Sequence, residues 1–186
     1  MDKDIEAALD VLLKGGIILY PTDTIWGIGC DATNERAVER IYKIKKRVDK
    51  EGMLVLLDSP ARLAQYVEIP DVAWELVDVA EKPLTIIYPG AKNLAANLMA
   101  GDSSVGIRIV KDNFCIKLIQ KFKRPVVSTS ANISGARSPQ VFSEIHKDII
   151  DSVDYVVKWR QDDLTRINPS GIIKLRLNGE VKVIRE

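Results

Sequence analysis

The chain has few of the side chains that most often carry metal and redox chemistry: its 186 residues include one histidine and two cysteines. One histidine excludes a multi-histidine metal site, and it leaves only His146 for a serine–histidine pair. His146 lies in Ser-Glu-Ile-His-Lys-Asp, a pattern typical of the polar face of a helix, so we expect a surface histidine and no metal site. Cys30 and Cys115 lie far apart without a Cys-x-x-Cys motif, which favours buried thiols in a reducing, cytoplasmic setting.

Long apolar runs and an excess of charge of one sign are also missing. No apolar run reaches the length of a membrane span and the N-terminus is acidic, so we expect neither a membrane segment nor a signal peptide. The net charge of +1 argues against bulk electrostatic capture of nucleic acid. With 46% hydrophobic and 28% charged residues, the composition indicates a soluble globular chain, and the length suits a single domain over residues 1–186.

Hydrophobic periodicity predicts alternating helices and strands. Helices are expected at 4–14, 34–47, 59–66, 71–80 and 112–122, and strands at 17–20, 53–57, 84–88, 105–110, 125–129, 153–157, 171–177 and 180–185. A polar loop is expected over 22–31. Asn178-Gly179 is typical of a type I′ turn, which requires antiparallel pairing near the end of the chain. We therefore expect an α/β fold with a twisted mixed sheet and flanking helices.

Small polar groups follow two of the predicted strands. The stretch 125–135, Pro-Val-Val-Ser-Thr-Ser-Ala-Asn-Ile-Ser-Gly, turns from an apolar run into hydroxyls and an amide. Such groups at the end of a buried strand are typical of anion sites in α/β proteins, although a serine-rich loop that caps a helix is the alternative interpretation. Residues 20–29, Tyr-Pro-Thr-Asp-Thr-Ile-Trp-Gly-Ile-Gly, place two hydroxyls, a carboxylate and an indole after another strand.

Cationic side chains are expected near these loops. Lys45, Lys46 and Arg47, with Lys50 shortly after them, end a predicted helix, where they could also simply complement the helix dipole. Arg108 is the one charge in an apolar strand, so we expect it to face a cleft and meet an anion. Guanidinium and hydroxyl donors with few candidate bases suit the binding of phosphates and carboxylates, and the stabilisation of charge in a transition state.

Two common nucleotide motifs do not apply. No Gly-x-x-x-x-Gly-Lys-[Ser/Thr] motif is present, which excludes a P-loop. Residues 27–32 match Gly-x-Gly-x-x-Ala, but six residues separate Tyr20 from Gly27, whereas the dinucleotide fingerprint begins directly after its strand. A Rossmann dehydrogenase is therefore disfavoured.

Several motifs together resemble the YrdC-type family, which contains the threonylcarbamoyl-AMP synthases. These are the 20–29 stretch, Lys45-x-Arg47, Lys-Pro-Leu-Thr at 82–85, Val-Gly-Ile-Arg at 105–108, Ser-Thr-Ser-Ala-Asn-Ile-Ser-Gly at 128–135 and Asn-Pro-Ser at 168–170. The resemblance implies one YrdC-like domain around a concave basic groove. It also implies a nucleotidyltransferase reaction in which L-threonine, bicarbonate and ATP, with Mg²⁺, give threonylcarbamoyl-adenylate and pyrophosphate.

The resemblance also implies roles for individual positions. Lys45 and Arg47 would be the catalytic cations that hold the ATP phosphates and the carbamate. The other substrate-binding and nucleotide-binding positions would be Thr22, Lys50, Thr85, Arg108, Ser128, Ser130, Asn132, Ser138, Ser170 and Arg185. At three places the chain departs from the family pattern: Val48 replaces a proline, Gly171 replaces the threonine of Pro-Ser-Thr, and Glu81-Lys82 replaces Pro-Gly, which could bring a negative charge near the phosphates.

The implied product would serve partner proteins that modify adenosine 37 of certain tRNAs in the cytoplasm. Two other functions remain open at this stage. One is a module that binds double-stranded RNA or tRNA without synthase activity, and the other is a carbamoyl-transfer enzyme with a different substrate on the same fold.

Overall fold

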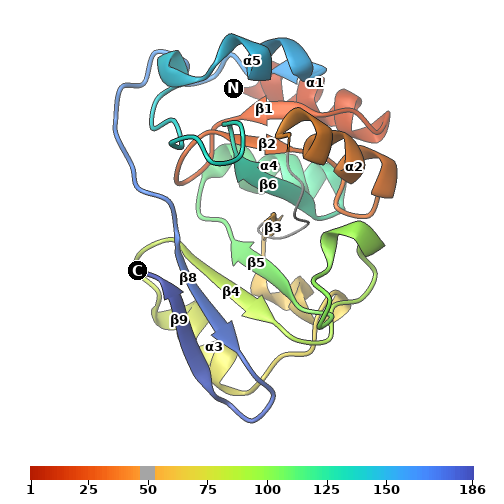
Figure 1. Cartoon of the computed structure of the whole chain (residues 1–186), viewed down its shortest axis with the longest axis vertical. Coiled ribbons are helices and arrows are strands. Elements are labelled where there is room, and N and C mark those ends of the chain that lie inside the picture. Colours follow the sequence, from red (N-terminus) through yellow and green to blue (C-terminus); the bar gives the residue numbers. More distant parts are fainter. Residues whose placement is uncertain (47–52) are drawn as a thin grey trace.

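The computed structural model describes residues 1–46 and 53–186, and the strands of these residues form one mixed sheet (Figure 1). The order in the sheet is β7-β1-β2-β6-β3-β5-β4-β8-β9. The strands are β1 (Ile18–Tyr20), β2 (Gly27–Gly29), β3 (Leu54–Leu57), β4 (Leu84–Tyr88), β5 (Val105–Ile109), β6 (Val126–Ser130), β7 (Tyr155–Val156), β8 (Gly171–Leu175) and β9 (Val181–Arg185). The predicted α/β fold with a mixed sheet is confirmed.

The helices flank this sheet. They are α1 (Asp2–Leu13), α2 (Glu35–Ile44), α3 (Val72–Val79), α4 (Asn113–Phe122) and α5 (Lys147–Ser152), with short 3₁₀ turns η1 (Pro60–Gln65), η2 (Ala96–Leu98) and η3 (Phe142–Glu144). Figure 1 shows α1, α2, α4 and α5 around β1, β2 and β6, and α3 beside the strands at the other end. Side-chain caps begin three of the α-helices: Asn34 accepts from two N–H groups of α2, Asp112 accepts from Cys115 N–H in α4, and His146 accepts from Asp148 N–H in α5.

Strand β6 joins the two halves of the sheet. It pairs antiparallel with β2 on one side, where Gly27 faces Ser130, and with β3 on the other, where Leu54 faces Ser128. Val126 and Val127 are fully buried in the core. The backbone of β6 is therefore held on both edges, and the polar side chains at its end are placed where the two halves meet.

Four local predictions need correction. The expected loop over 22–31 contains β2, a strand of only three residues whose two glycines give it no apolar alternation to read. The expected helix over 59–66 is the 3₁₀ turn η1. His146 is exposed as predicted, but it caps the start of α5 instead of lying on a helical face.

The fourth correction concerns the turn before β9. A type I′ turn needs positive φ at both central residues, and here Gly179 (φ +82°) is in the left-handed region while Asn178 is not. Gly179 N–H donates to Arg176 O at 2.9 Å, and Arg176 N–H donates to Glu180 O at 3.0 Å. This pattern is that of a three-residue hairpin loop with its left-handed residue at Gly179.

None of the helices in the described residues is long and apolar enough to cross a membrane.

A glycine in β2 is required by close packing. A Cβ atom at Gly29 would lie 2.5 Å from Val127 O and 2.6 Å from Cε1 of the buried Tyr20. We expect Gly29→Ala to lower the free energy of unfolding by about 3 kcal/mol, because neither neighbour can move without disturbing the core. Urea denaturation followed by circular dichroism measures this loss.

The matched control is Gly101→Ala, whose Cβ would meet no atom within 4 Å. It is expected to change the free energy of unfolding by less than about 0.5 kcal/mol. Equal losses in the two variants would contradict this account of β2.

Candidate functional site

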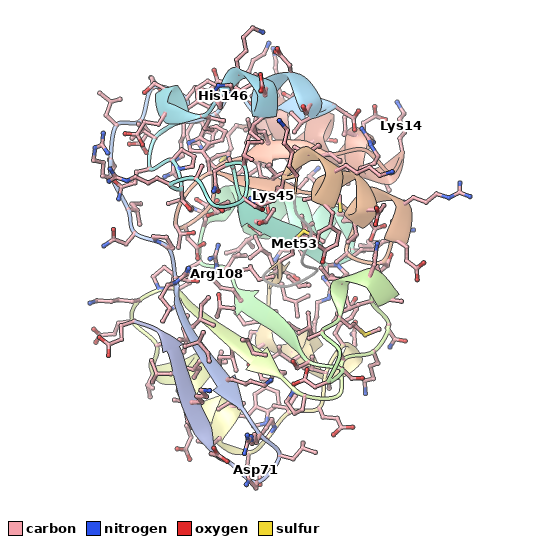
Figure 2. All side chains as sticks on the ribbon, viewed as in Figure 1. Lys14, Lys45, Met53, Asp71, Arg108 and His146 are labelled. Carbon is pink, nitrogen blue, oxygen red and sulfur yellow. The ribbon has the colours of Figure 1, made fainter. Side chains whose placement is uncertain are left out.

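A cavity of about 590 Å³ lies where the two halves of the sheet meet. Its lining comes from residues 24–27, which lead into β2, and from the residues that follow α2. It also comes from β3, β5, β6 with the loop after it, β8 with the residues before it, and the end of β9. Figure 2 shows Lys45 and Arg108 near the middle of the molecule, with His146 and Asp71 at opposite ends. Of the predicted site residues that the structure describes, the lining includes Lys45, Arg108, Ser128, Ser130, Asn132, Ser138, Ser170 and Arg185.

The described lining is positively charged. It contains Lys45, Lys46, Arg108 and Arg185, and none of its described residues is a carboxylate. Partial burial lowers the pKa of Arg185, and the nearby charge of Arg108 lowers it further. Two guanidinium groups that repel one another beside a cavity favour a ligand that brings negative charge.

Hydroxyl groups of β6 form one wall of the cavity. Ser128 and Thr129 are buried and belong to the strand itself, in agreement with the predicted strand over 125–129. Across from them, a Cβ at Gly27 would lie 2.9 Å from Ser128 Oγ. The glycine of the neighbouring strand thus leaves room for the serine hydroxyl.

Lys45 fixes the loop that follows β6. It caps the C-terminus of α2, and Lys46 then adopts a left-handed conformation (φ +50°) that ends the helix at the cavity. The ammonium group of Lys45 is buried and donates to Ser130 O at 2.6 Å and to Asn132 O at 2.8 Å. The Ser134 N–H also donates to Lys45 O. Lys45 therefore holds the shape of this loop as well as carrying charge.

Asn132 shapes the next turn of the same loop. Its amide nitrogen donates to Ile133 O at 2.9 Å and to Ala136 O at 2.7 Å, which fixes the orientation of the amide. Its Oδ1 atom is buried and has no hydrogen-bond partner among the described residues. An acceptor of this kind in the lining can receive a hydrogen bond from a ligand.

Thr85, Ser170 and Arg185 form a connected group at the other wall. The hydroxyls of Thr85 and Ser170 lie 2.8 Å apart and both residues are buried. Arg185 donates through Nε and Nη2 to Ser170 O, at 3.0 and 2.7 Å. Because Thr85 faces Arg108 in the pairing of β4 with β5, this group continues directly into the Arg108 position.

Arg108 is buried and is held by the loop after β1. Its Nη2 atom lies 3.0 Å from Asp23 Oδ1 and 3.4 Å from Thr22 Oγ1, to which it donates. Thr22 and Thr85 do not line the cavity themselves; they contact Arg108 and Ser170, which do. Their roles toward a substrate stay predictions, as do those of Arg47 and Lys50, which lie outside the described residues.

Sequence reasoning left several lining residues out of the predicted site: Thr24, Ile25, Trp26, Gly27, Lys46, Leu54, Thr129, Ser134, Gly135, Pro169 and Ile172. Most belong to motifs that the sequence already showed. Trp26 packs against Phe142 with ring centroids 4.9 Å apart, a contact that no sequence pattern reveals. Glu81 is exposed and absent from the lining, so the negative charge expected there does not enter the cavity wall.

The described part of the chain offers no cluster of three or more metal-ligating side chains. Mg²⁺ prefers oxygen ligands and commonly binds through one or two carboxylates together with substrate phosphates. Because the described lining lacks a carboxylate, its residues do not fit a magnesium ion held by the protein. Cys30 and Cys115 are buried in the core, and burial raises the pKa of both thiols.

The chain is similar to proteins of one family. The Sua5_yciO_yrdC family model, described as telomere recombination, matches residues 10–186. A threonylcarbamoyl-AMP synthase of Pseudoalteromonas translucida is 32% identical over 95% of this chain and 95% of its own length. One from Idiomarina loihiensis is 31% identical over 91% of each chain.

Solved structures share the fold. The structure of P. abyssi Sua5 complexed with L-threonine matches with a TM-score of 0.83 and 26% identity, over 94% of this chain and 52% of that one. E. coli YciO matches with a TM-score of 0.86 and 24% identity, over 100% of this chain and 90% of that one, which shows a common fold. The present chain thus spans about half the length of the Sua5 chain and nearly all of the two bacterial synthases.

The contacts of Lys45 can be tested against those of its neighbour. We expect Lys45→Met to lower the free energy of unfolding by about 2 kcal/mol, because two partly buried carbonyls lose a charged donor. Lys46→Met is the matched control, since the Lys46 side chain lines the same cavity and makes no hydrogen bond to a described residue. It should change stability by less than about 0.5 kcal/mol. Equal losses in urea denaturation would contradict a loop-holding role for Lys45.

Proposed function

The chain belongs to the Sua5/YciO/YrdC family, and we propose that it is a threonylcarbamoyl-AMP synthase that uses L-threonine, bicarbonate and ATP. The observation that carries the proposal is the cavity in which four cations and several hydroxyls meet. Most of the lining residues lie in the motifs that gave the family resemblance, and Leu54, Ser138, Ile172 and Arg185 lie outside them. Relatives over nearly the full chain carry the synthase name, which favours this function over an RNA-binding module without chemistry.

The proposed reaction needs binding and charge stabilisation more than a strong base. Bicarbonate takes up a proton and loses water to give CO₂. The amine of threonine then adds to CO₂ and releases a proton to solvent, which leaves a carbamate. A carbamate oxygen then attacks the α-phosphorus of ATP, the bond to the bridging oxygen breaks, and pyrophosphate leaves with that electron pair. The carbamate is already an anionic nucleophile, so a chain whose one histidine lies on the surface can still support the reaction.

The chain's own residues divide into two groups. Ser128, Ser130, Asn132 and Ser138 would bind the nucleotide and its phosphates, with Lys46 adding charge at the same wall. Lys45 would fix the loop that carries these groups, and Arg47 and Lys50 are proposed to reach the phosphates on the strength of the motif alone. Charge that builds up on the phosphoryl oxygens would be neutralised by these cations and hydroxyls.

The second group would bind the amino acid. Arg108 is the proposed partner of the threonine carboxylate, because a guanidinium forms strong paired hydrogen bonds with a carboxylate. Thr22, Thr85 and Ser170 surround Arg108 and would complete this end, while Arg185 would close over the nucleotide. Mg²⁺ would enter on the phosphates of ATP, where it supplies further charge neutralisation.

The product would be passed to partner proteins for modification of tRNA adenosine 37 in the cytoplasm. This step rests on the family resemblance, because the names of the relatives specify the synthase alone. Direct contact with tRNA or double-stranded RNA would be an additional property of the chain.

Pyrophosphate release tests the proposed reaction. The purified chain with ATP, Mg²⁺ and bicarbonate should release pyrophosphate only when L-threonine is added. We expect Arg108→Gln to lower kcat/KM for threonine about 100-fold, because the substrate carboxylate loses its charged partner.

The matched control is Arg176→Gln, because Arg176 is exposed and pairs with Glu180 away from the cavity. It should keep the activity of the unaltered chain. Pyrophosphate release that does not depend on threonine would rule the proposal out, and so would equal activity of the Arg108→Gln and unaltered chains.

A further inference from the structure

Asp23 forms a buried ion pair behind the cavity. Its Oδ1 atom lies 3.0 Å from Nη2 of Arg108, and the two side chains are 9% and 3% exposed. Asp23 is not in the lining, whereas Arg108 is. A charge as deeply buried as Arg108 is costly without a partner, and among the described residues Asp23 is the only carboxylate that pairs with it.

The ion pair involves one nitrogen of the guanidinium, and Asp23 Oδ1 accepts no hydrogen bond from the described residues. Both described contacts of Arg108, to Asp23 and to Thr22 Oγ1, involve Nη2. The Nε atom is buried and has no hydrogen-bond partner among the described residues. A guanidinium has five N–H donors, so Asp23 fixes one part of the group and leaves other donors for a ligand.

Asp23 is itself held in place. Its second oxygen accepts from the backbone N–H of Lys111, just beyond β5, at 3.3 Å. The preceding carbonyl, Thr22 O, accepts from Arg160 Nη1 at 3.2 Å, and the same nitrogen pairs with Asp112 at 3.3 Å. The loop after β1 is thus tied to the β5–α4 junction at two adjacent residues, which gives the carboxylate a fixed position.

We propose that Asp23 is a positioning residue that holds the Arg108 guanidinium for recognition of the substrate carboxylate. This inference rests on the proposed function, because it concerns how the same site binds L-threonine. Asp23 touches no substrate in this arrangement; it acts through Arg108. The pair also keeps the Arg108 side chain ordered before a substrate binds, so little ordering remains to be done on binding.

Two effects of Asp23 have opposite signs, and this makes the proposal testable. Its negative charge partly cancels the charge of Arg108, so electrostatics alone predicts that Asp23→Asn strengthens the binding of an anionic ligand. Positioning predicts the reverse, because the freed guanidinium can turn away from the cavity. The direction of the change in threonine affinity therefore separates the two.

The experiment compares Asp23→Asn, Asp23→Glu and the unaltered chain in the pyrophosphate assay, with threonine affinity also measured by calorimetry. We expect Asp23→Asn to raise KM for threonine at least tenfold and to leave KM for ATP within about twofold. Asp23→Glu keeps a carboxylate and should restore most of the threonine affinity. The matched control is Asp102→Asn, which removes an aspartate paired with Lys174 outside this cavity and should leave both KM values unchanged.

The double variant Asp23→Asn/Arg108→Gln keeps the test decisive if Asp23→Asn alone fails to fold, because it removes both buried charges together. It should have the same KM for threonine as Arg108→Gln alone, since Asp23 acts only through Arg108. An unchanged or lower KM for threonine in Asp23→Asn would overturn the proposal. A further rise in the double variant over Arg108→Gln would do the same. If the unaltered chain releases no threonine-dependent pyrophosphate, the proposed function itself fails, which is a separate result.

Discussion

Strand β6 is the part of the fold on which the cavity depends, because among the described strands it is the one that pairs with both halves of the sheet. Its pairing with β2 and β3 places Ser128, Thr129 and Ser130 between the end of α2 and the start of β3. The ammonium of Lys45 then secures the outgoing loop through two carbonyls. Since a strand paired on both edges cannot shift its register without exposing Val126 and Val127, the polar groups are held as rigidly as the core.

The second constraint is electrostatic. Lys45, Lys46, Arg108 and Arg185 reach the cavity from three well-separated parts of the sequence, and each is fixed by the backbone of a helix end or a strand. Burial, and after it the nearby charge of Arg108, lower the pKa of Arg185, so holding these cations in a partly buried space is unfavourable. An anionic ligand would offset the positive charge of these cations, and this electrostatic attraction would contribute to the free energy of ligand binding.

Much of the fold could be predicted from the sequence, because segments with a clear hydrophobic periodicity form the helices and strands that this periodicity predicts. The helix at 112–122 and the strands at 84–88 and 105–110 match the structure closely, since each has an apolar face that must be buried. The helix at 34–47 was placed correctly at its start, but α2 ends at Ile44, before the expected end. Strand β2 was missed because Gly-Ile-Gly has no alternation of apolar and polar side chains. The strand is formed by pairing with β1 and β6. The hairpin type was wrong because Asn178 keeps a negative φ and the loop takes a third residue.

The site was predictable in its members and less so in their arrangement. Motifs indicated Ser128, Ser130, Arg108 and Ser170, and all four line one cavity. The sequence could not show that the Lys45 ammonium would donate hydrogen bonds to backbone carbonyls, or that Asp23 would pair with Arg108. Both contacts join residues that lie far apart in the chain. The place of Trp26 in the cavity lining was also not predictable, because Trp26 packs against Phe142, which lies far away in the sequence.

A crystal structure with a non-hydrolysable ATP analogue and L-threonine tests the central claim most directly, that one cavity binds both substrates. The account predicts the threonine carboxylate within hydrogen-bonding distance of Arg108, and the triphosphate against the loop that follows β6, beside Lys46. Ligands bound elsewhere, for example in the groove between α1 and α4 lined by Glu6 and Lys121, would contradict it.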